Sequence, residues 1–218
     1  MLHFRSSSII PAATAAGAGL CMAVGLLAVM KRRRGRTALQ VEKRLSDGRQ
    51  LVVREGTAAD SHQIYTMLEK LVLFQKLPED LLTADTIRHS SNNLNISSYD
   101  LLKDFLAGRY HTAIAEVEGS PVGYALFYPG YSTWDGKSIH LEDIYVDEDL
   151  RGEGIGRSLI EYVAKLAARE GYARMDWSAV DWNVGAHRFY ESIGAKKESE
   201  WIPFVLDHDG IAALASSN

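Results

Sequence analysis

The sequence of 218 residues holds a single cysteine, Cys21. A disulfide needs two thiols, so the folded domain contains none, which fits a reducing compartment. The seven histidines are scattered, and no His–Cys cluster has metal-ligand spacing, so we expect no metal site. No segment of the chain repeats another.

Acidic residues are absent from residues 1–41, which carry six basic side chains. Within this segment, residues 9–30 are uncharged, and a basic cluster, Lys31–Arg36, follows. The run is long enough to cross a hydrocarbon core of about 30 Å, and the cluster would hold the following domain in the cytoplasm. A mitochondrial transit peptide also lacks acids. The sequence therefore predicts an apolar extension over residues 1–48. We favour a transmembrane helix at 9–30 with a cytoplasmic catalytic domain, and a transit peptide with a mitochondrial location is the alternative.

The rest of the chain has little positive charge. Beyond residue 41 it holds 18 basic and 28 acidic side chains, a net charge of −10. An acidic domain attracts cations and repels nucleic acid, so we expect no nucleic-acid partner. The same charge also serves solubility alone, so it supports a cationic ligand without requiring one.

The most informative segment present is a glycine-rich turn between an apolar strand and a helix, within Leu141–Arg157. Glycine lets backbone N–H groups approach a ligand, and the following helix N-terminus adds unpaired N–H groups and a positive dipole end. The turn therefore favours an anion such as a phosphate. A P-loop needs Lys after its last glycine, and a dinucleotide fingerprint needs glycine where Arg157 stands, so both fail. What remains is Arg-x-x-Gly-x-Gly at Arg151, Gly154 and Gly156, or an ordinary strand–turn–helix corner.

The pattern Arg-x-x-Gly-x-Gly resembles the acyl-CoA signature of the GCN5-related N-acetyltransferase (GNAT) superfamily. Further blocks resemble its diamine acetyltransferase subfamily, which includes spermidine/spermine and thialysine Nε-acetyltransferases. This resemblance runs from about Leu51 to about Leu206. It implies an enzyme that moves an acetyl group from acetyl-CoA to the primary amine of a small diamine, polyamine or lysine-like amino acid, acting as a homodimer. The blocks are Tyr131–Trp134, Leu141–Val146, Asp181–Asn183, Arg188–Tyr190 and Gly194–Ala195.

The fold class expected for residues 49–218, the N-acetyltransferase domain, is α/β. The resemblance implies a mixed, mostly antiparallel sheet flanked by helices. Hydrophobic patterns and turn signals predict where the elements lie. Strands are expected at 50–54, 111–117, 122–128, 138–146, 174–180 and 201–206, and helices at 57–74, 79–88, 157–170 and 183–193.

The resemblance also implies which residues hold acetyl-CoA. The strand end would offer backbone groups to the pantetheine arm, the glycine turn would hold the pyrophosphate, and the start of the last predicted helix would add further contacts. Asn183 is also a good helix N-cap by propensity. The implied cofactor-binding residues are Ile144, Tyr145, Val146, Arg151, Gly152, Glu153, Gly154, Ile155, Gly156, Arg157, Asn183, Val184, Gly185 and Ala186.

Two side chains are candidates for proton transfer. An amine with a pKa of about 10.4 arrives protonated, and a carboxylate can take that proton. The resemblance gives this role to Glu142. Strand alternation puts Glu142 and Asp143 on opposite faces, unless a bulge turns the strand. The resemblance makes Tyr190 the general acid toward the leaving thiolate, whereas from sequence alone it reads as a core aromatic.

The amine site is expected around the same strand. The candidate substrate-binding residues are Phe74, Gln75, Trp134, Glu142, Asp143, Asp176, Trp177 and Ser178. Tryptophan is more often a core residue, so the alternative for the two tryptophans is a role in packing. Polyamine-selective relatives carry acids where Gln75 and Ser132 stand, which favours a thialysine-type acceptor. The loop before Trp201 is shorter than in the family, so Glu200 is given no role.

Two other functions remain open. One is acetylation of protein lysines or N-termini, which the same fold supports. The other is a non-catalytic, membrane-tethered acyl-CoA-binding protein. The presence of both Glu142 and Tyr190 argues against a pure binder, which needs neither.

Overall fold

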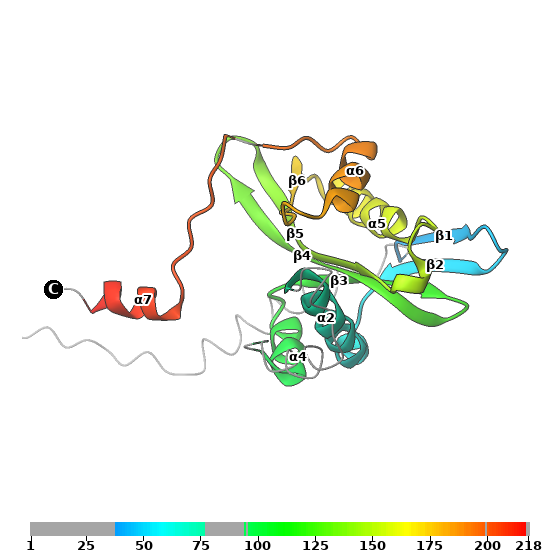
Figure 1. Ribbon diagram of the computed structural model, residues 1–218, viewed down its shortest axis with the longest axis horizontal. Coiled ribbons are helices and arrows are strands. Elements are labelled where there is room, and N and C mark those ends of the chain that lie inside the picture. The colour runs from blue at the N-terminus through cyan, green and yellow to red at the C-terminus, as the bar shows by residue number, and fades with distance from the viewer. Residues whose placement is uncertain (1–37, 77–93, 95, 199, 217–218) are drawn as a thin grey trace, which may run out of the picture.

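The computed structural model describes residues 38–76, 94, 96–198 and 200–216 (Figure 1). The transmembrane helix predicted at residues 9–30 and the helix predicted at 79–88 lie outside this range. Among the described helices, none is both long enough and apolar enough to cross a membrane.

One sheet runs through the described residues, with its strands side by side in chain order. Neighbouring strands pair antiparallel up to β5, and β5 pairs parallel with β6. This confirms the predicted mixed, mostly antiparallel sheet. The strands are β1 (Gln40–Arg44), β2 (Gln50–Glu55), β3 (His111–Val117), β4 (Ser120–Ser132), β5 (Gly136–Val146) and β6 (Arg174–Asp176).

Helices cover both faces of the sheet, so the strands bury side chains on both sides (Figure 1). The helices α2 (Ser61–Lys76) and α4 (Ser98–Leu106) pack on one face, and α5 (Ile155–Glu170) and α6 (Val184–Ser192) lie over the other. A short 3-10 turn, η1 (Ala58–Asp60), leads into α2, and a second, η4 (Glu148–Leu150), precedes the glycine turn. The predicted α/β class is therefore confirmed.

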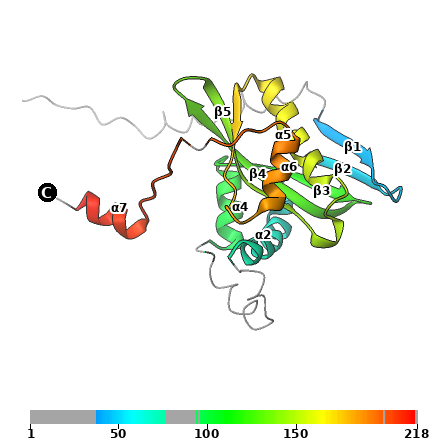
Figure 2. The ribbon, with the colours of Figure 1, turned by 45° about the horizontal axis from the view of Figure 1, so that its top comes forward.

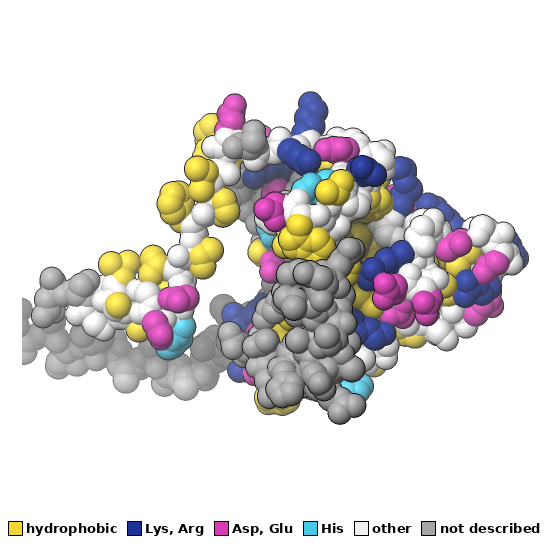
Figure 3. Space-filling model, viewed as in Figure 1, with side chains coloured by type: hydrophobic (Ala, Val, Ile, Leu, Met, Phe, Trp, Pro, Cys, Tyr) yellow, Lys and Arg dark blue, Asp and Glu magenta, His cyan; other side chains and the backbone are white. Residues whose placement is uncertain are grey.

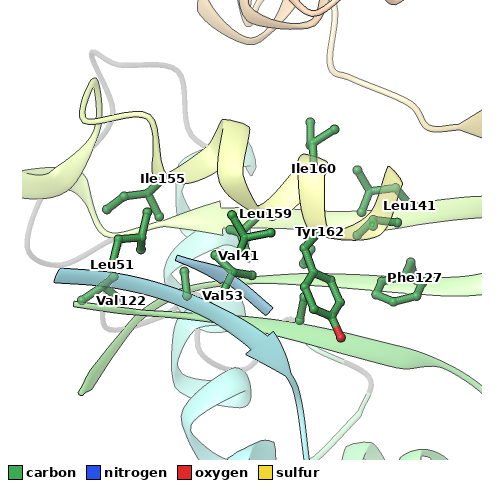
Figure 4. Close-up of a cluster of buried hydrophobic side chains, with 14 of the residues drawn as sticks. Val41, Leu51, Val53, Val122, Phe127, Leu141, Ile155, Leu159, Ile160 and Tyr162 are labelled. Atoms are coloured by element: carbon green, nitrogen blue, oxygen red, sulfur yellow. The ribbon is translucent and has the colours of Figure 1, made fainter. Parts of the chain in front are cut away.

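The helix α5 is the main support of the core. Its residues Ile155, Leu159, Tyr162 and Val163 recur on one face and are all at most 2% exposed, packed against the strands (Figure 4). This spacing is the one that places side chains on one side of an α-helix. The helix begins at Ile155, directly after Gly154, and ends before Gly171, and both glycines have the left-handed conformation that glycine adopts readily. The helix therefore starts two residues earlier than the predicted start at Arg157.

Strand β1 lies inside the segment predicted as the extension. Its Val41 and the following Leu45 are buried in the core beneath α5, and β1 pairs along its whole length with β2. The sheet thus starts about ten residues before the expected first strand. The prediction overlooked this strand because it buries a single side chain, which leaves little hydrophobic pattern to read.

The C-terminal segment differs most from expectation. The strand predicted at Trp201–Leu206 is wrong: these residues form no strand, and their side chains are 54–93% exposed. The segment leaves the body of the molecule and ends in a helix, α7 (His208–Ala215), as Figures 1 and 2 show. Trp, Ile, Phe and Val favour strands, but a strand needs a neighbour, and no described strand lies beside this one. Likewise, β6 ends at Asp176, four residues earlier than predicted.

Candidate active site

A cavity of about 620 Å³ opens beside the C-terminal half of β5. Its wall is formed by the end of α2, by β5, by the glycine turn, by the segment after β6 and by α6. Most of the predicted site residues meet there although they come from five separate segments. Those lining it are Phe74, Gln75, Glu142, Asp143, Ile144, Tyr145, Val146, Arg151, Gly152, Gly154, Ile155, Gly156, Arg157, Trp177, Ser178, Asn183, Gly185, Ala186 and Tyr190.

The glycine turn gives this cavity an anion-binding end. Gly152 and Gly154 have φ values of +86° and +81°, a left-handed conformation that side chains disfavour. Gly154 also caps α5 without any side chain, so the cap residue provides no side-chain oxygen for the first N–H groups of the helix. Those N–H groups and the positive end of the helix dipole suit a diphosphate. The backbone here therefore fits the pyrophosphate of acetyl-CoA.

Arg151 connects this turn with the opposite wall. Its guanidinium lies 4.9 Å from the centre of the Phe74 ring, and its Nε donates a hydrogen bond of 3.3 Å to the Val146 carbonyl. The positive charge is thus held at the edge of the cavity, near the anion-binding turn. The predicted neighbour Glu153 does not line the cavity, because its carboxylate accepts a hydrogen bond of 2.6 Å from the Ser46 hydroxyl.

One edge of β5 is open along the cavity. β5 pairs with β6 only from Ser138 to His140, so Leu141–Val146 pairs with β4 alone in the described chain. The backbone groups on the free edge can hydrogen-bond an extended ligand in the way an added strand would. This edge therefore fits the pantetheine arm, as the sequence predicted for Ile144–Val146.

The start of α6 forms the next part of the wall. Asn183 caps the helix by accepting a hydrogen bond of 3.0 Å from the Ala186 N–H, which confirms the predicted N-cap. Gly185 and Ala186 line the cavity, whereas Val184 is exposed and does not.

A register shift brings two carboxylates to the cavity. Leu126 pairs with Asp143, but the next residue, Phe127, pairs with Leu141, so Glu142 is an extra residue in β5. Such a bulge interrupts the alternation of side chains. Glu142 and Asp143 consequently both line the cavity instead of lying on opposite faces.

The two carboxylates have different surroundings. Burial, together with the nearby Glu142 charge, raises the pKa of Asp143 to about 6, and the buried Tyr124 hydroxyl lies 3.5 Å from the Asp143 carboxylate and donates to it. The Glu142 side chain is 53% exposed and accepts a hydrogen bond of 3.2 Å from the Tyr128 hydroxyl. Glu142 is therefore the more accessible carboxylate.

Tyr190 projects from α6 into the same cavity. Its ring packs against Trp177 and Phe189, at centroid distances of 5.2 and 5.3 Å, and burial raises its pKa. Its hydroxyl makes no hydrogen bond to another described residue. The ring thus has the packing of a core aromatic, and the hydroxyl is still available to donate a proton.

Three predicted or considered residues lie elsewhere. Trp134 is 84% exposed at the turn between β4 and β5, where it contacts Trp201 at 6.2 Å. Asp176 lies in β6 behind the cavity wall, and its carboxylate contacts His140 at 2.7 Å. Glu200 is exposed and does not line the cavity. Trp134 and Asp176 are therefore not part of the wall to which the prediction assigned them.

Sequence reasoning missed six residues of the wall, all of them apolar. These shape the cavity by packing, and hydrophobic periodicity is the signal that could have identified them. They are Leu71, Leu141, Leu150, Ala179, Val180 and Phe189.

Comparisons with known proteins agree with this geometry. A family model described as the Acetyltransferase (GNAT) family matches residues 78–195. The thialysine N-epsilon-acetyltransferase of Bos taurus is 31% identical over 176 residues, covering 76% of this chain and 97% of the relative. That of Mus musculus is 33% identical over 176 residues, covering 75% and 96%. An L-ornithine N5-acetyltransferase of Arabidopsis thaliana is 38% identical over 97 residues, covering 44% and 42%.

Solved structures support the fold. An integron cassette protein of V. cholerae superposes with a TM-score of 0.58 at 20% identity, covering 77% of this chain and 98% of that one. An aminoglycoside acetyltransferase from an uncultured soil metagenomic sample gives a TM-score of 0.57 at 18% identity, covering 71% and 94%.

Proposed function

Because the chain belongs to the acetyltransferase (GNAT) family and is an acetyl-CoA-dependent N-acetyltransferase, we propose that it acetylates a small primary amine. The favoured acceptor is a lysine-like amino acid of the thialysine type or a short diamine, ahead of long polyamines. The observation that carries this proposal is the meeting of two carboxylates, Glu142 and Asp143, in one cavity with the anion-binding turn. The names of the relatives point to the same class of amine.

The residues that would hold acetyl-CoA would do so mainly through their backbone groups. Gly152, Gly154 and the first turn of α5 would receive the pyrophosphate, and the free edge of β5 would receive the pantetheine arm. Acetyl-CoA supplies the acetyl group as a thioester. Since the anion site is made of backbone, its contribution to binding depends on the turn conformation more than on any one side chain.

Glu142 is the proposed proton acceptor. A carboxylate oxygen of Glu142 would take one proton from the bound ammonium, leaving a nitrogen lone pair free to attack. Asp143, at the next position, would add negative charge that attracts the cation. Tyr190 would donate its hydroxyl proton to the leaving sulfur, and its packing between Trp177 and Phe189 fixes the ring that carries it.

The preference for a short acceptor depends on Gln75. It lines the cavity and is neutral, so the far end of a long polyamine would find no carboxylate at this position. Ser132, the second neutral position noted in the sequence, has a different role. Its hydroxyl accepts hydrogen bonds from the N–H groups of Trp134 and Asp135 in the β4–β5 turn and does not line the cavity.

Acetyl-CoA turnover against a panel of amines tests the proposal. The panel contains thialysine, lysine, ornithine, putrescine, spermidine, spermine and a lysine-containing peptide, with Glu142→Gln as the inactive control. We expect kcat/KM for thialysine or a short diamine to exceed that for spermine. Faster turnover of spermine would place the protein with the polyamine enzymes, and turnover of the peptide alone would favour the protein-acetylating alternative.

We also propose that two copies associate through the exposed apolar segment Trp201–Leu206. Figure 3 shows hydrophobic side chains gathered along this segment and α7, away from the body of the molecule. The exposure of an apolar surface of this kind to water is energetically unfavourable, and such surfaces often mark sites of protein association. Light scattering should give a dimer for residues 38–218 and a monomer for residues 38–200. A monomeric longer fragment would contradict the proposal.

For the extension, we retain the proposal of a membrane anchor at residues 9–30, with a transit peptide as the alternative. N-terminal sequencing of the native protein separates the two. A start at Met1 supports the anchor, and a start between Thr37 and Arg44 contradicts it.

A further inference from the structure

A histidine, His140, lies next to Glu142. His140 of β5 faces Asp176 of β6, because these two residues are register partners where the two strands run parallel. The His140 Nδ1 atom lies 2.7 Å from the Asp176 Oδ1 atom. On the other side of the ring, the Nε2 atom lies 3.7 Å from the Glu142 Oε2 atom. The imidazole therefore stands between two carboxylates, one of them at the cavity.

The hydrogen bond to Asp176 decides which nitrogen carries a proton. A carboxylate accepts hydrogen bonds, so Nδ1 must donate. In the neutral ring Nε2 then holds a lone pair, directed toward Glu142. The 3.7 Å separation is slightly longer than a hydrogen bond, so a proton transfer between the two groups would require these atoms to approach each other. Glu142 and Tyr128 thus both lie next to an imidazole nitrogen that can accept a proton.

Other groups complete the surroundings of this imidazole. Tyr128 of β4 packs beside the ring at a centroid distance of 5.1 Å and donates to Glu142. Arg174 of β6 donates to the second Asp176 oxygen at 3.3 Å and also contacts Asp135 of the β4–β5 turn at 3.3 Å. Asp176 is therefore held from two directions and has little freedom to leave His140.

Stability alone gives a weak reason for this arrangement. The His140 and Asp176 side chains are 30% and 38% exposed, and ion pairs at such positions contribute little to folding. A carboxylate that fixes the tautomer of an imidazole facing a reacting acid or base is instead a known way to organise proton transfer.

We propose that His140, oriented by Asp176, is a positioning residue that receives the proton collected by Glu142 and releases it to solvent. This inference rests on the proposed acetylation of an amine. In the first transfer, the N–H bond of the substrate ammonium breaks and an O–H bond forms on Glu142. In the second, that O–H bond breaks and an N–H bond forms at His140 Nε2. The imidazolium is stabilised by Asp176 and gives its proton to water, which returns both residues to their starting states.

The variants His140→Gln and Asp176→Asn test this relay. Either change should lower kcat by about tenfold, less than the loss of about a hundredfold or more expected for a direct general base. The affinity for acetyl-CoA should not change, because neither residue lies at the glycine turn. The acid limb of the pH profile of kcat/KM should change shape in both variants. His62→Gln, an exposed histidine at the start of α2, serves as the matched control.

The double variant and the ring tautomer separate a relay from simple packing. We expect His140→Gln/Asp176→Asn to be no slower than His140→Gln alone, since Asp176 acts only through the imidazole. Nitrogen NMR of the wild type should show a proton on Nδ1 of His140, and Asp176→Asn should abolish this preference. Additive losses in the double variant, or an unchanged pH profile, would overturn the proposal.

The outcome also distinguishes this inference from the proposed function. If wild-type enzyme acetylates none of the amines, the proposed function fails, and the relay, which needs an ammonium proton, fails with it. If wild-type enzyme is active and His140→Gln retains wild-type kcat and pH dependence, only the relay is refuted.

Discussion

The two ends of the cavity are built from different parts of the chain. At the end proposed for acetyl-CoA, called the cofactor end below, Gly152, Gly154 and the free edge of β5 present backbone N–H and C=O groups. At the end proposed for the amine, called the amine end, the polar groups are side chains: Glu142, Asp143 and, next to Glu142, His140. Glycines and a helix start build the first end, whereas strand register builds the second.

This difference decides how each end responds to substitution. A backbone site tolerates changes that preserve the conformation and fails when charge or shape blocks the approach of the ligand. A site made of side chains can lose its function through one substitution that replaces a reacting group and leaves the fold intact. Substitutions at the two ends should therefore separate affinity for acetyl-CoA from the rate of the reaction.

The largest expected effect belongs to the amine end. Glu142→Gln keeps the size of the side chain and removes the proton acceptor, so kcat should fall by about 10²–10⁴-fold. Calorimetry should show unchanged acetyl-CoA affinity, which would place the defect in proton transfer. A variant with wild-type kcat would move this role to Asp143.

A smaller rate effect is expected where the two ends meet. Tyr190→Phe removes one hydroxyl and keeps the ring packed against Trp177, so kcat should fall by about a hundredfold with little change in acetyl-CoA affinity. Steady-state kinetics with thialysine measures the change. Wild-type turnover would return Tyr190 to the role of a core aromatic.

At the cofactor end, affinity should change instead. Gly154→Asp introduces a negative charge where a pyrophosphate would bind, and acetyl-CoA should bind about a hundredfold more weakly. Gly154→Asn is the matched control, because Asn tolerates the left-handed conformation and adds no charge. Equal affinities of the two variants in calorimetry would show that charge at this turn is unimportant.

A pH-dependent effect is expected at Asp143. Its pKa in the folded state is about 6, above the ordinary value of 3.8. The folded state thus binds the carboxyl proton of Asp143 more tightly than the unfolded state does. The contribution of this proton to the free energy of unfolding is therefore complete below about pH 3.8 and is lost as pH rises through 6. Asp143→Asn should be more stable than the wild type at pH 7, by up to about 3 kcal/mol. Denaturant unfolding at pH 4.5 and 7 measures this, with the exposed Asp149→Asn as control.

The smallest effect concerns the length of the amine. Gln75→Glu places a carboxylate on the cavity wall, which should raise kcat/KM for spermine relative to thialysine by about tenfold or less, because the side chain is exposed. Competition between the two amines at fixed ionic strength gives the ratio. A ratio that stays unchanged would remove Gln75 from the selectivity argument.

The sequence could predict what is decided locally. The Asn183 N-cap and the glycine turn before α5 each depend on a few neighbouring residues. Each was expected, and each is present. The local structure of the cofactor end could therefore be predicted from the sequence.

The amine end depends on pairing between distant strands. Glu142 and Asp143 share a cavity because β4 and β5 shift register near Leu126, and His140 meets Asp176 because β5 and β6 align there. No local pattern encodes either alignment. The same reason explains the wrong strand at Trp201–Leu206, where suitable residues find no neighbour within the described chain.

The bulge at Glu142 has a consequence for how this protein can change. Removing that one residue would restore regular pairing between β4 and β5 and give a more uniform sheet. It would also take one carboxylate out of the cavity and shift the remaining one. The irregular strand is therefore a point where regular pairing is exchanged for a second carboxylate at the cavity, so a variant lacking residue 142 would separate the contribution of this residue to activity from its cost to stability.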